Sequence, residues 1–178
     1  MFAPFMKTLS VMIFFSWSAF AGDPAAIDAL KIACGSDAVK FNVRSSEGRP
    51  PAQPEPGKAL VYVVEQYERP GNELGTPTVR VGLDGAWVGA NRGTSHLFFP
   101  IEAGEHHLCS DWQSAPFWIG ARVSLTSLTA EPGQTYYFRA RVMESSPSVW
   151  TLDLDPVNSD EGRLLVGTSP LSDYRQKK

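Results

Sequence analysis

The sequence predicts an all-β fold, a β-sandwich of about eight or nine strands with short helices near both ends. Several short segments alternate apolar and polar residues with a period of two, which is typical of strands that bury one face. Turn residues separate these segments, and the 178-residue chain contains 15 Gly and 14 Pro. Short strands at regular spacing indicate a sandwich rather than an α/β layout, and the length fits one domain.

The first 21 residues are typical of a secretory signal peptide. Lys7 precedes an apolar stretch over residues 9–17, and Ala19 and Ala21 then form a small-x-small cleavage site. We expect the mature chain to begin at Gly22 and to be periplasmic or secreted. The apolar stretch has about half of the roughly 20 residues that a transmembrane helix needs, so we predict no transmembrane segment in the mature chain.

Residues 22–36 are predicted to form an N-terminal helical segment. Asp23 can cap a helix that has Pro24 at its first position, and apolar residues then recur at intervals of three and four up to Gly35. From residue 37 onward the period changes to two. We therefore place the β-sandwich domain at residues 37–167.

Within this domain, apolar alternation and β-branched residues predict the strands. The run at 58–67 is apolar almost throughout, so we expect a central strand covered on both faces. It follows a stretch at 49–57 with four prolines in nine residues, which predicts an extended connector. Further strands are predicted at 39–44, 78–83, 86–91, 95–101, 105–112, 117–128, 134–142 and 149–154.

Three turn and cap signals connect these segments. The pair Asp84-Gly85 predicts a tight β-hairpin between its flanking strands. Residues 102–104 predict a second hairpin with a three-residue loop. Asn158 or Ser159 can cap a short helix, and residues 168–178 are expected to form a C-terminal tail that frays.

The two cysteines, Cys34 and Cys109, predict one disulfide, because exported proteins commonly form such bonds. Two free buried thiols or a redox-active pair are the alternatives. A redox pair usually has close spacing, such as C-x-x-C. The wide separation in this chain therefore favours a structural bond.

Charge composition argues against a nucleic-acid partner. The chain has 16 basic and 19 acidic residues and a net charge of −3, and its basic residues form no run. Such a sequence offers little to neutralise a phosphate backbone.

Three stretches in order carry a resemblance to a known family: Gly57–Val63, Val81–Gly85 with Gly89 after it, and Gly104–His106 followed by Ala130–Tyr137. Together they resemble the bacterial family of small exported or lipid-anchored proteins catalogued as domain of unknown function 2846. The likeness spans roughly residues 41–165 and extends distantly to surface modules of the PEGA type. It implies an immunoglobulin-like or prealbumin-like sandwich and carries over no catalytic residues. This chain lacks a cysteine at the signal junction, which argues against a lipid anchor.

The histidines are weak candidates for a metal site. His106 and His107 are neighbours on a predicted strand and should point to opposite faces, so both cannot reach one metal without a bulge. A site would need His107 with Glu105, or His106 with His96 from across the second hairpin. A histidine that bonds a turn carbonyl or packs on an aromatic ring is the simpler interpretation.

The densest group of oxygen ligands contains Asp153, Asp155 and Asp160, which are weak candidates for calcium. The calcium-binding EF-hand loop has a fixed spacing of acidic residues and a central glycine. Here Val157 and Asn158 occupy two of the required positions, so that motif fails. An irregular calcium site is an alternative to a solvated acidic strand face, and we predict no cofactor.

The sequence contains no coherent catalytic set. The nucleophile motif G-x-S-x-G of serine hydrolases is absent, and a disulfide would remove both cysteines as nucleophiles. We therefore expect a protein that is not an enzyme. A hydrolase of unrecognised type is the least favoured alternative.

Aromatic residues near loops are the candidate binding residues. Trp87 lies two residues beyond the Asp84-Gly85 turn, and Phe117 and Trp118 follow a Ser-Ala-Pro loop. Asp84, in the turn itself, is a further candidate binding residue. Exposed aromatic rings can stack on sugars or anchor a protein partner, although packing in the core is their commoner role. We expect a binding or structural module of the bacterial cell envelope, with an envelope protein or glycan as partner, and a small metal-binding or calcium-binding protein as the alternative.

Overall fold

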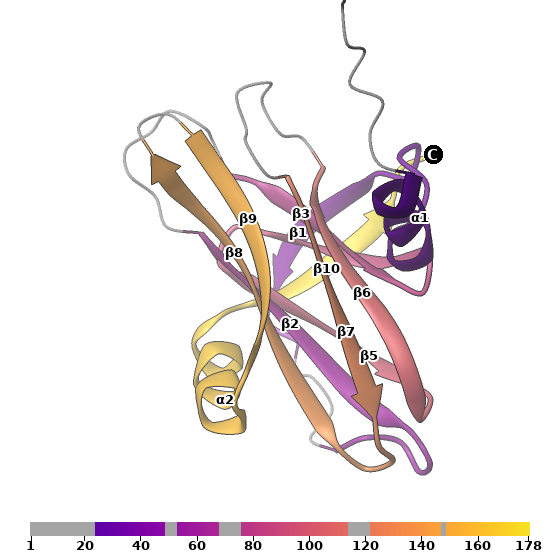
Figure 1. Ribbon diagram of the computed structural model, residues 1–178. Helices are drawn as coiled ribbons and strands as arrows, with labels where there is room; N and C mark the ends of the chain where they lie inside the picture. Colours follow the sequence, from indigo (N-terminus) through magenta and orange to yellow (C-terminus); the bar gives the residue numbers. More distant parts are fainter. Residues whose placement is uncertain (1–23, 49–52, 68–75, 114–121, 147–148) are drawn as a thin grey trace, which may run out of the picture.

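The computed structural model describes residues 24–48, 53–67, 76–113, 122–146 and 149–178. Within these residues the chain forms ten strands and two helices (Figure 1). The elements are α1 (Pro24–Ala33), β1 (Phe41–Ser46), β2 (Ala59–Tyr67), β3 (Thr78–Leu83), β4 (Ala86–Arg92), β5 (Ser95–Ile101), β6 (Gly104–Trp112), β7 (Val123–Ala130), β8 (Thr135–Ser146), β9 (Val149–Val157), α2 (Ser159–Thr168) and β10 (Leu171–Gln176).

The strands form two sheets, which confirms the predicted all-β sandwich. One sheet has six strands in the order β1-β10-β5-β2-β8-β9, and the other has four in the order β4-β3-β6-β7. α1 and the C-terminus lie near one end of the sandwich, whereas α2 lies at the opposite end, against β8 and β2 (Figure 1). No helix in the described part of the chain is long and apolar enough to cross a membrane.

The core consists mainly of small branched side chains from both sheets. β2 is central in its sheet, and its residues 59–65 are all buried, as its apolar run predicts. The odd-numbered residues Val61 and Val63 belong to the main core cluster between the sheets. On the other face, Tyr62 stacks on Tyr137 of the neighbouring strand, with 5.3 Å between ring centroids. Burial on both faces is therefore provided by the opposite sheet on one side and by aromatic packing on the other.

One charged residue lies inside this core. Glu65 is fully buried, and neither carboxyl oxygen has a hydrogen-bond partner of normal geometry among the described residues. Burial raises the pKa of Glu65 well above its ordinary value, although the nearby backbone amides of Gly93 and Val79 oppose this shift. The folded protein therefore favours the protonated, neutral carboxyl.

The prediction of a hairpin at residues 102–104 is wrong, whereas the prediction of a hairpin at Asp84-Gly85 is confirmed. β3 and β4 pair directly across the Asp84-Gly85 turn. β5 and β6, in contrast, belong to different sheets, so the chain between them crosses from one layer to the other. β5 pairs with β2 and β10, and β6 pairs with β3 and β7. The same turn residues therefore serve an inter-sheet connection, because both strands find long-range partners.

The prediction that the chain frays after residue 167 is also wrong, because Leu171–Gln176 form strand β10. β10 pairs with β1 through six residue pairs and with β5 in parallel at Leu171 and His96. Ser172 is buried, and the ring of Tyr174 packs edge-on against Phe41 at 5.9 Å between centroids. These contacts with distant residues hold a polar segment as a strand in the sheet.

The two helices form where their cap signals predict. α1 begins at Pro24, and the Asp23 expected to cap it lies outside the described residues. Asn158 caps α2: its side-chain oxygen accepts hydrogen bonds from the backbone amides of Asp160 and Glu161, both at 3.0 Å. Gly162 of α2 lies against Tyr137, where an added Cβ would come within 2.2 Å of the ring. Glycine therefore permits the close packing of α2 on β8.

The predicted disulfide between Cys34 and Cys109 is confirmed. It joins the residue after α1 to β6 across a sequence separation of 75. An added Cβ on Gly82 of β3 would lie 2.8 Å from the carbonyl oxygen of Ala33, so this glycine allows the end of α1 to approach the sheet. Such a bond is stable in an oxidising environment outside the cytoplasm.

Candidate binding pocket

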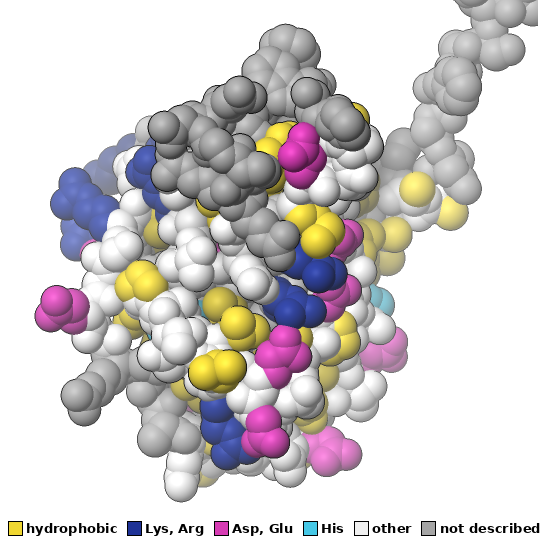
Figure 2. All heavy atoms as spheres, turned by 90° about the vertical axis from the view of Figure 1, so that its left-hand side faces the viewer, with side chains coloured by type: hydrophobic (Ala, Val, Ile, Leu, Met, Phe, Trp, Pro, Cys, Tyr) yellow, Lys and Arg dark blue, Asp and Glu magenta, His cyan; other side chains and the backbone are white. Residues whose placement is uncertain are grey.

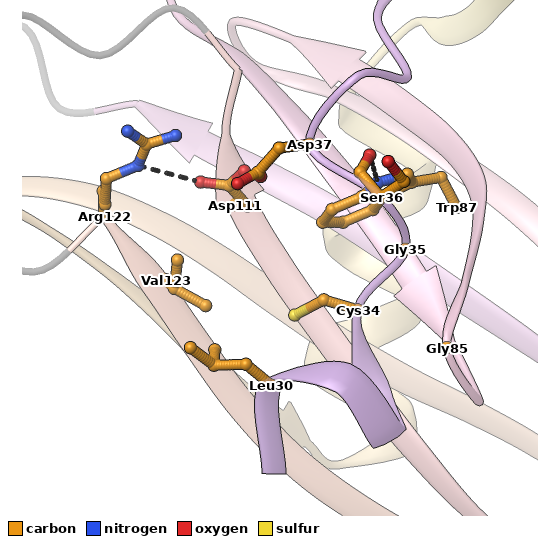
Figure 3. A pocket seen from close by; sticks show the side chains of 10 residues that line it. All are labelled: Leu30, Cys34, Gly35, Ser36, Asp37, Gly85, Trp87, Asp111, Arg122 and Val123. Atoms are coloured by element: carbon orange, nitrogen blue, oxygen red, sulfur yellow. Dashed lines mark hydrogen bonds and ion pairs between the residues drawn. The ribbon is translucent and has the colours of Figure 1, made fainter. Parts of the chain in front are cut away.

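A pocket of about 490 Å³ opens between the end of α1, the β3–β4 turn and the start of β7 (Figure 3). This volume lies within the usual range for a small-molecule site. Its lining residues are Leu30, Cys34, Gly35, Ser36, Asp37, Gly85, Trp87, Asp111, Arg122 and Val123. The disulfide and the positive-φ Gly85 turn position two of its walls.

One side of the pocket is apolar. Leu30 of α1 is 38% exposed, although it is a large hydrophobic side chain, and it faces the pocket with Cys34 and Val123. Exposed aliphatic side chains that converge on a concave surface are typical of ligand sites. The indole of Trp87 forms the opposite wall (Figure 3).

The sequence suggests an exposed Trp87 side chain near the tip of the β3–β4 hairpin. In the structure, neighbouring residues hold this side chain in place. It is half-buried, and its Nε1 donates a hydrogen bond to the carbonyl oxygen of Ser36 at 2.8 Å. The Arg80 guanidinium lies 4.1 Å from its ring centroid. Gly35 packs so closely that an added Cβ would lie 2.5 Å from the indole. The pocket therefore presents an indole in a defined orientation.

Arg80 and Asp111 form a buried ion pair behind this wall. The Asp111 side chain is 3% exposed and accepts a hydrogen bond from Arg80, which is completely buried. Arg80 also donates to the carbonyl oxygen of Val39 at 2.7 Å and pairs with the Asp37 carboxylate at 3.3 Å. Burial lowers the pKa of Arg80, and Asp37 opposes this shift. An arginine so placed stays charged, and its partners compensate for its burial.

Arg122 supplies the accessible cation of the pocket. Its Nε donates to the second oxygen of Asp111 at 3.2 Å, and its side chain is 50% exposed. The described residues provide no acceptor for its two terminal nitrogens, which point away from Asp111 in Figure 3. Asp111 thus orients a guanidinium whose outer edge can donate to a ligand.

Asp84, the other candidate near this turn, serves the turn itself. It has a left-handed backbone with φ 49°, and its carboxylate accepts from the His107 amide at 2.8 Å. Its other oxygen pairs with Nδ1 of His106 at 2.7 Å, and Nε2 of His106 lies 2.9 Å from the Glu102 carbonyl oxygen. Both ring nitrogens face acceptors, which suits an imidazolium that donates from both sides.

The pKa values of this pair follow from these contacts. Burial opposes protonation of His106, but its hydrogen bonds to Asp84 and Glu102 raise its pKa above the ordinary value. Burial would raise the pKa of Asp84, but the His107 amide and His106 outweigh it and hold that pKa low. The pair therefore stabilises the β3–β4 turn rather than lining the pocket.

The structure does not assemble the metal candidates. His96 and His106 lie in different sheets, so the pairing considered across the second hairpin fails with that hairpin. Asp155 pairs with Arg141 and Asp160 with Arg163, each at 3.3 Å, and Asp153 lies opposite Arg141 in the β8–β9 register. Figure 2 shows acidic and basic side chains next to one another on this side of the molecule. Among the described residues no three His, Cys, Asp or Glu side chains could hold a metal.

Phe117 and Trp118 lie outside the described residues, as does the predicted signal peptide. Four charged residues at or behind the pocket were not predicted from the sequence, namely Asp37, Arg80, Asp111 and Arg122. A signal for one of them existed: an arginine between Val79 and Val81 in an apolar strand requires a buried partner. The identity of that partner depends on the pairing of β3 with β6, which no local pattern reveals.

Comparison with protein-family models, curated proteins and solved structures gave no match for this chain. The resemblance noted from the sequence stays a prediction. The function is therefore inferred from the geometry of the site.

Proposed function

We propose that this protein is a non-enzymatic binding module of the bacterial cell envelope that holds a neutral glycan segment in the pocket beside Trp87. The observation that carries this proposal is the combination in one concave site of an apolar wall, a fixed indole and the outer edge of the Arg122 guanidinium, which has no acceptor among the described residues. Sugar rings present apolar C–H faces and polar edges, and both find complementary groups here.

The charge balance of the pocket favours a neutral ligand. The carboxylates of Asp37 and Asp111 offset the guanidinium groups of Arg80 and Arg122, and these groups pair with one another. Of these four groups only Asp37, Asp111 and Arg122 line the pocket, so a strongly anionic ligand would meet two carboxylates and a cation would meet Arg122. Hydroxyl and acetamido groups can instead accept from the outer nitrogens of Arg122 and donate to the exposed Asp37 carboxylate.

The envelope location is part of the proposal. It combines the predicted signal peptide, with cleavage after Ala21, and the Cys34–Cys109 disulfide, which suits an oxidising compartment. The periplasm and the extracellular surface both meet this condition. Glycans are abundant in both, so the proposed ligand and location agree.

The test is a titration of the purified chain with soluble N-acetylated amino-sugar oligomers, in which calorimetry measures binding and the melting temperature measures stabilisation. A ligand at 100 times its dissociation constant should add about 2.7 kcal/mol of stability. Arg122→Gln should weaken binding about tenfold, because Asp111 keeps Arg80 as its partner while the ligand loses a charged donor. Leu30→Glu, at an exposed position, should also weaken binding.

The matched control is Arg163→Gln on α2, which removes the same charge from an exposed ion pair at the opposite end of the sandwich. It should bind like the parent chain. If saturating oligomer gives neither binding heat nor a shift in melting temperature, the proposed glycan ligand is rejected. Equal losses in Arg163→Gln and Arg122→Gln would reject the pocket as the site.

A further inference from the structure

A second concavity, of about 640 Å³, lies where the β1 edge of the six-stranded sheet meets the ends of β3, β4 and β6. We call it the basic groove. Its lining residues are Phe41, Asn42, Val43, Arg44, Thr76, Thr78, Arg92, Gln113, Asp173, Arg175 and Lys177. The groove is therefore built from both sheets and is separate from the Trp87 pocket.

The arginines of the groove differ from the other arginines of the described chain. Of the eight described arginines, five form ion pairs, namely Arg80, Arg122, Arg139, Arg141 and Arg163. The other three are Arg44, Arg92 and Arg175, which have no ion pair within the described residues, and all three line the groove.

The net charge of the groove is strongly positive in an acidic protein. Three arginines and Lys177 face a single carboxylate, that of Asp173, so the lining carries a net charge of +3 (4 − 1), whereas the whole chain carries −3. Like charges that converge repel one another, and among the lining residues Asp173 alone offsets part of this repulsion. An arrangement of this kind is stabilised when an anion binds.

The backbone holds these cations on two walls. Asn42 pairs in register with Arg175, and Arg44 with Asp173, on the paired strands β1 and β10. Arg92 projects from the end of β4, opposite Thr78 of β3. The side-chain amide of Asn42 and the hydroxyl of Thr78, which also line the groove, add neutral donors. A ligand with two separated anionic groups can contact both walls at once.

Lys40 lies beside the groove, and its ammonium donates to the Gln113 carbonyl oxygen at 3.3 Å. Burial is the largest cause that lowers the pKa of Lys40; Arg80, Arg122 and Lys177 lower it further, and Asp37 opposes them. Of these cations only Lys177 lines the basic groove.

We propose that the basic groove binds a soluble ligand that carries two or more phosphate groups, which bridge Arg44 and Arg175 on one wall and Arg92 on the other. A chain of phosphates fits a concave site with donors on both sides. A flat anionic bilayer does not, because it cannot enter a concavity. The proposal is independent of the glycan pocket.

The probe is inorganic tripolyphosphate, added to the purified chain at low ionic strength and measured by calorimetry. We expect binding that weakens as salt is added, because partly exposed charges are screened. The double variant Arg44→Gln with Arg92→Gln should bind about tenfold more weakly, because one cation is lost from each wall. Both residues are exposed, so the fold should persist.

Two further variants make the test specific. Asp173→Asn removes the opposing carboxylate and should tighten binding several-fold. Arg163→Gln on α2 removes a cation elsewhere and should change nothing. Vesicles with and without phosphatidylglycerol test the other source of phosphate.

Three results would overturn the proposal: no tripolyphosphate binding, equal affinity in the double variant and the parent chain, or binding to anionic vesicles without binding to tripolyphosphate. The last result would assign the surface to a membrane instead. Failure of these experiments would leave the glycan proposal untouched, because that ligand and the Arg122 pocket are assayed separately.

Discussion

Loss of the disulfide between Cys34 and Cys109 should destabilise the protein by about 4 kcal/mol. The bond closes a loop across 75 residues. In the chain-entropy model this closure restricts the unfolded chain by that amount, and strain in the folded state can only reduce it. For a chain of this length, about 4 kcal/mol corresponds to a melting temperature lower by about 8–16 °C.

The structure predicts a local effect as well. Of the α1 side chains that are described, only Ala33 is buried, so the described side chains contribute little packing against the sandwich. Cys109 is completely buried in β6 and anchors the end of α1 through the bond. Without it, the amides of α1 should lose protection from hydrogen exchange before the strands do.

The assay is urea unfolding of the oxidised chain, the reduced chain and the Cys34→Ala, Cys109→Ala double variant. The reduced chain keeps both sulfur atoms, so it separates the covalent link from the packing of the sulfur. The double variant should not respond to reductant. If the oxidised and fully reduced chains unfold within about 1 kcal/mol of each other, the loop-closure argument is refuted.

Three further predictions follow from single side chains. Gly162→Ala should destabilise the protein by about 1–3 kcal/mol, because the added methyl group clashes with Tyr137. Gly167→Ala in the same helix, where an added Cβ meets nothing within 4 Å, should instead stabilise it by about 0.5–1 kcal/mol, and equal effects of the two variants in thermal melts would contradict this. Glu65→Gln should be as stable as the parent chain near pH 4 and more stable than it by roughly 1 kcal/mol or more at alkaline pH. The reason is that the pKa of Glu65 is raised in the folded state, so its contribution to stability is complete below the unfolded pKa and is lost as the pH rises through the folded pKa. Parallel curves of melting temperature against pH for the two proteins would refute this. Asp84→Asn keeps a residue suited to positive φ but removes the negative charge beside His106. An NMR titration should then show that the pKa of His106 falls towards its ordinary value, and an unchanged pKa would disprove the coupling between Asp84 and His106.

Local signals were sufficient for much of the fold. The apolar run of β2, the Asp84-Gly85 turn and the Asn158 cap each depend on residues close in sequence, and each forms as predicted. Side-chain periodicity reports which face of a strand is buried. The pairing of the two cysteines also followed from their number, because two cysteines allow only one intramolecular bond.

Periodicity does not report which strand lies alongside. The segments on either side of residues 102–104 have the pattern of a hairpin, yet they enter different sheets because each finds longer-range partners. The polar segment 171–176 has little strand character by itself, and its contacts with β1 and β5 make it a strand.

The two proposed sites are decided entirely at this level. Asp111 meets Arg80 and Arg122 because β6 lies between β3 and β7. The three arginines that have no ion pair among the described residues line one groove because β1 and β10 meet the end of β4. The sequence by itself determined the class of fold, the covalent link and the burial of most strands. Only tertiary structure decided which charges neutralise one another and which stay available, because electrostatic pairing acts between side chains that are close in space and distant in the chain.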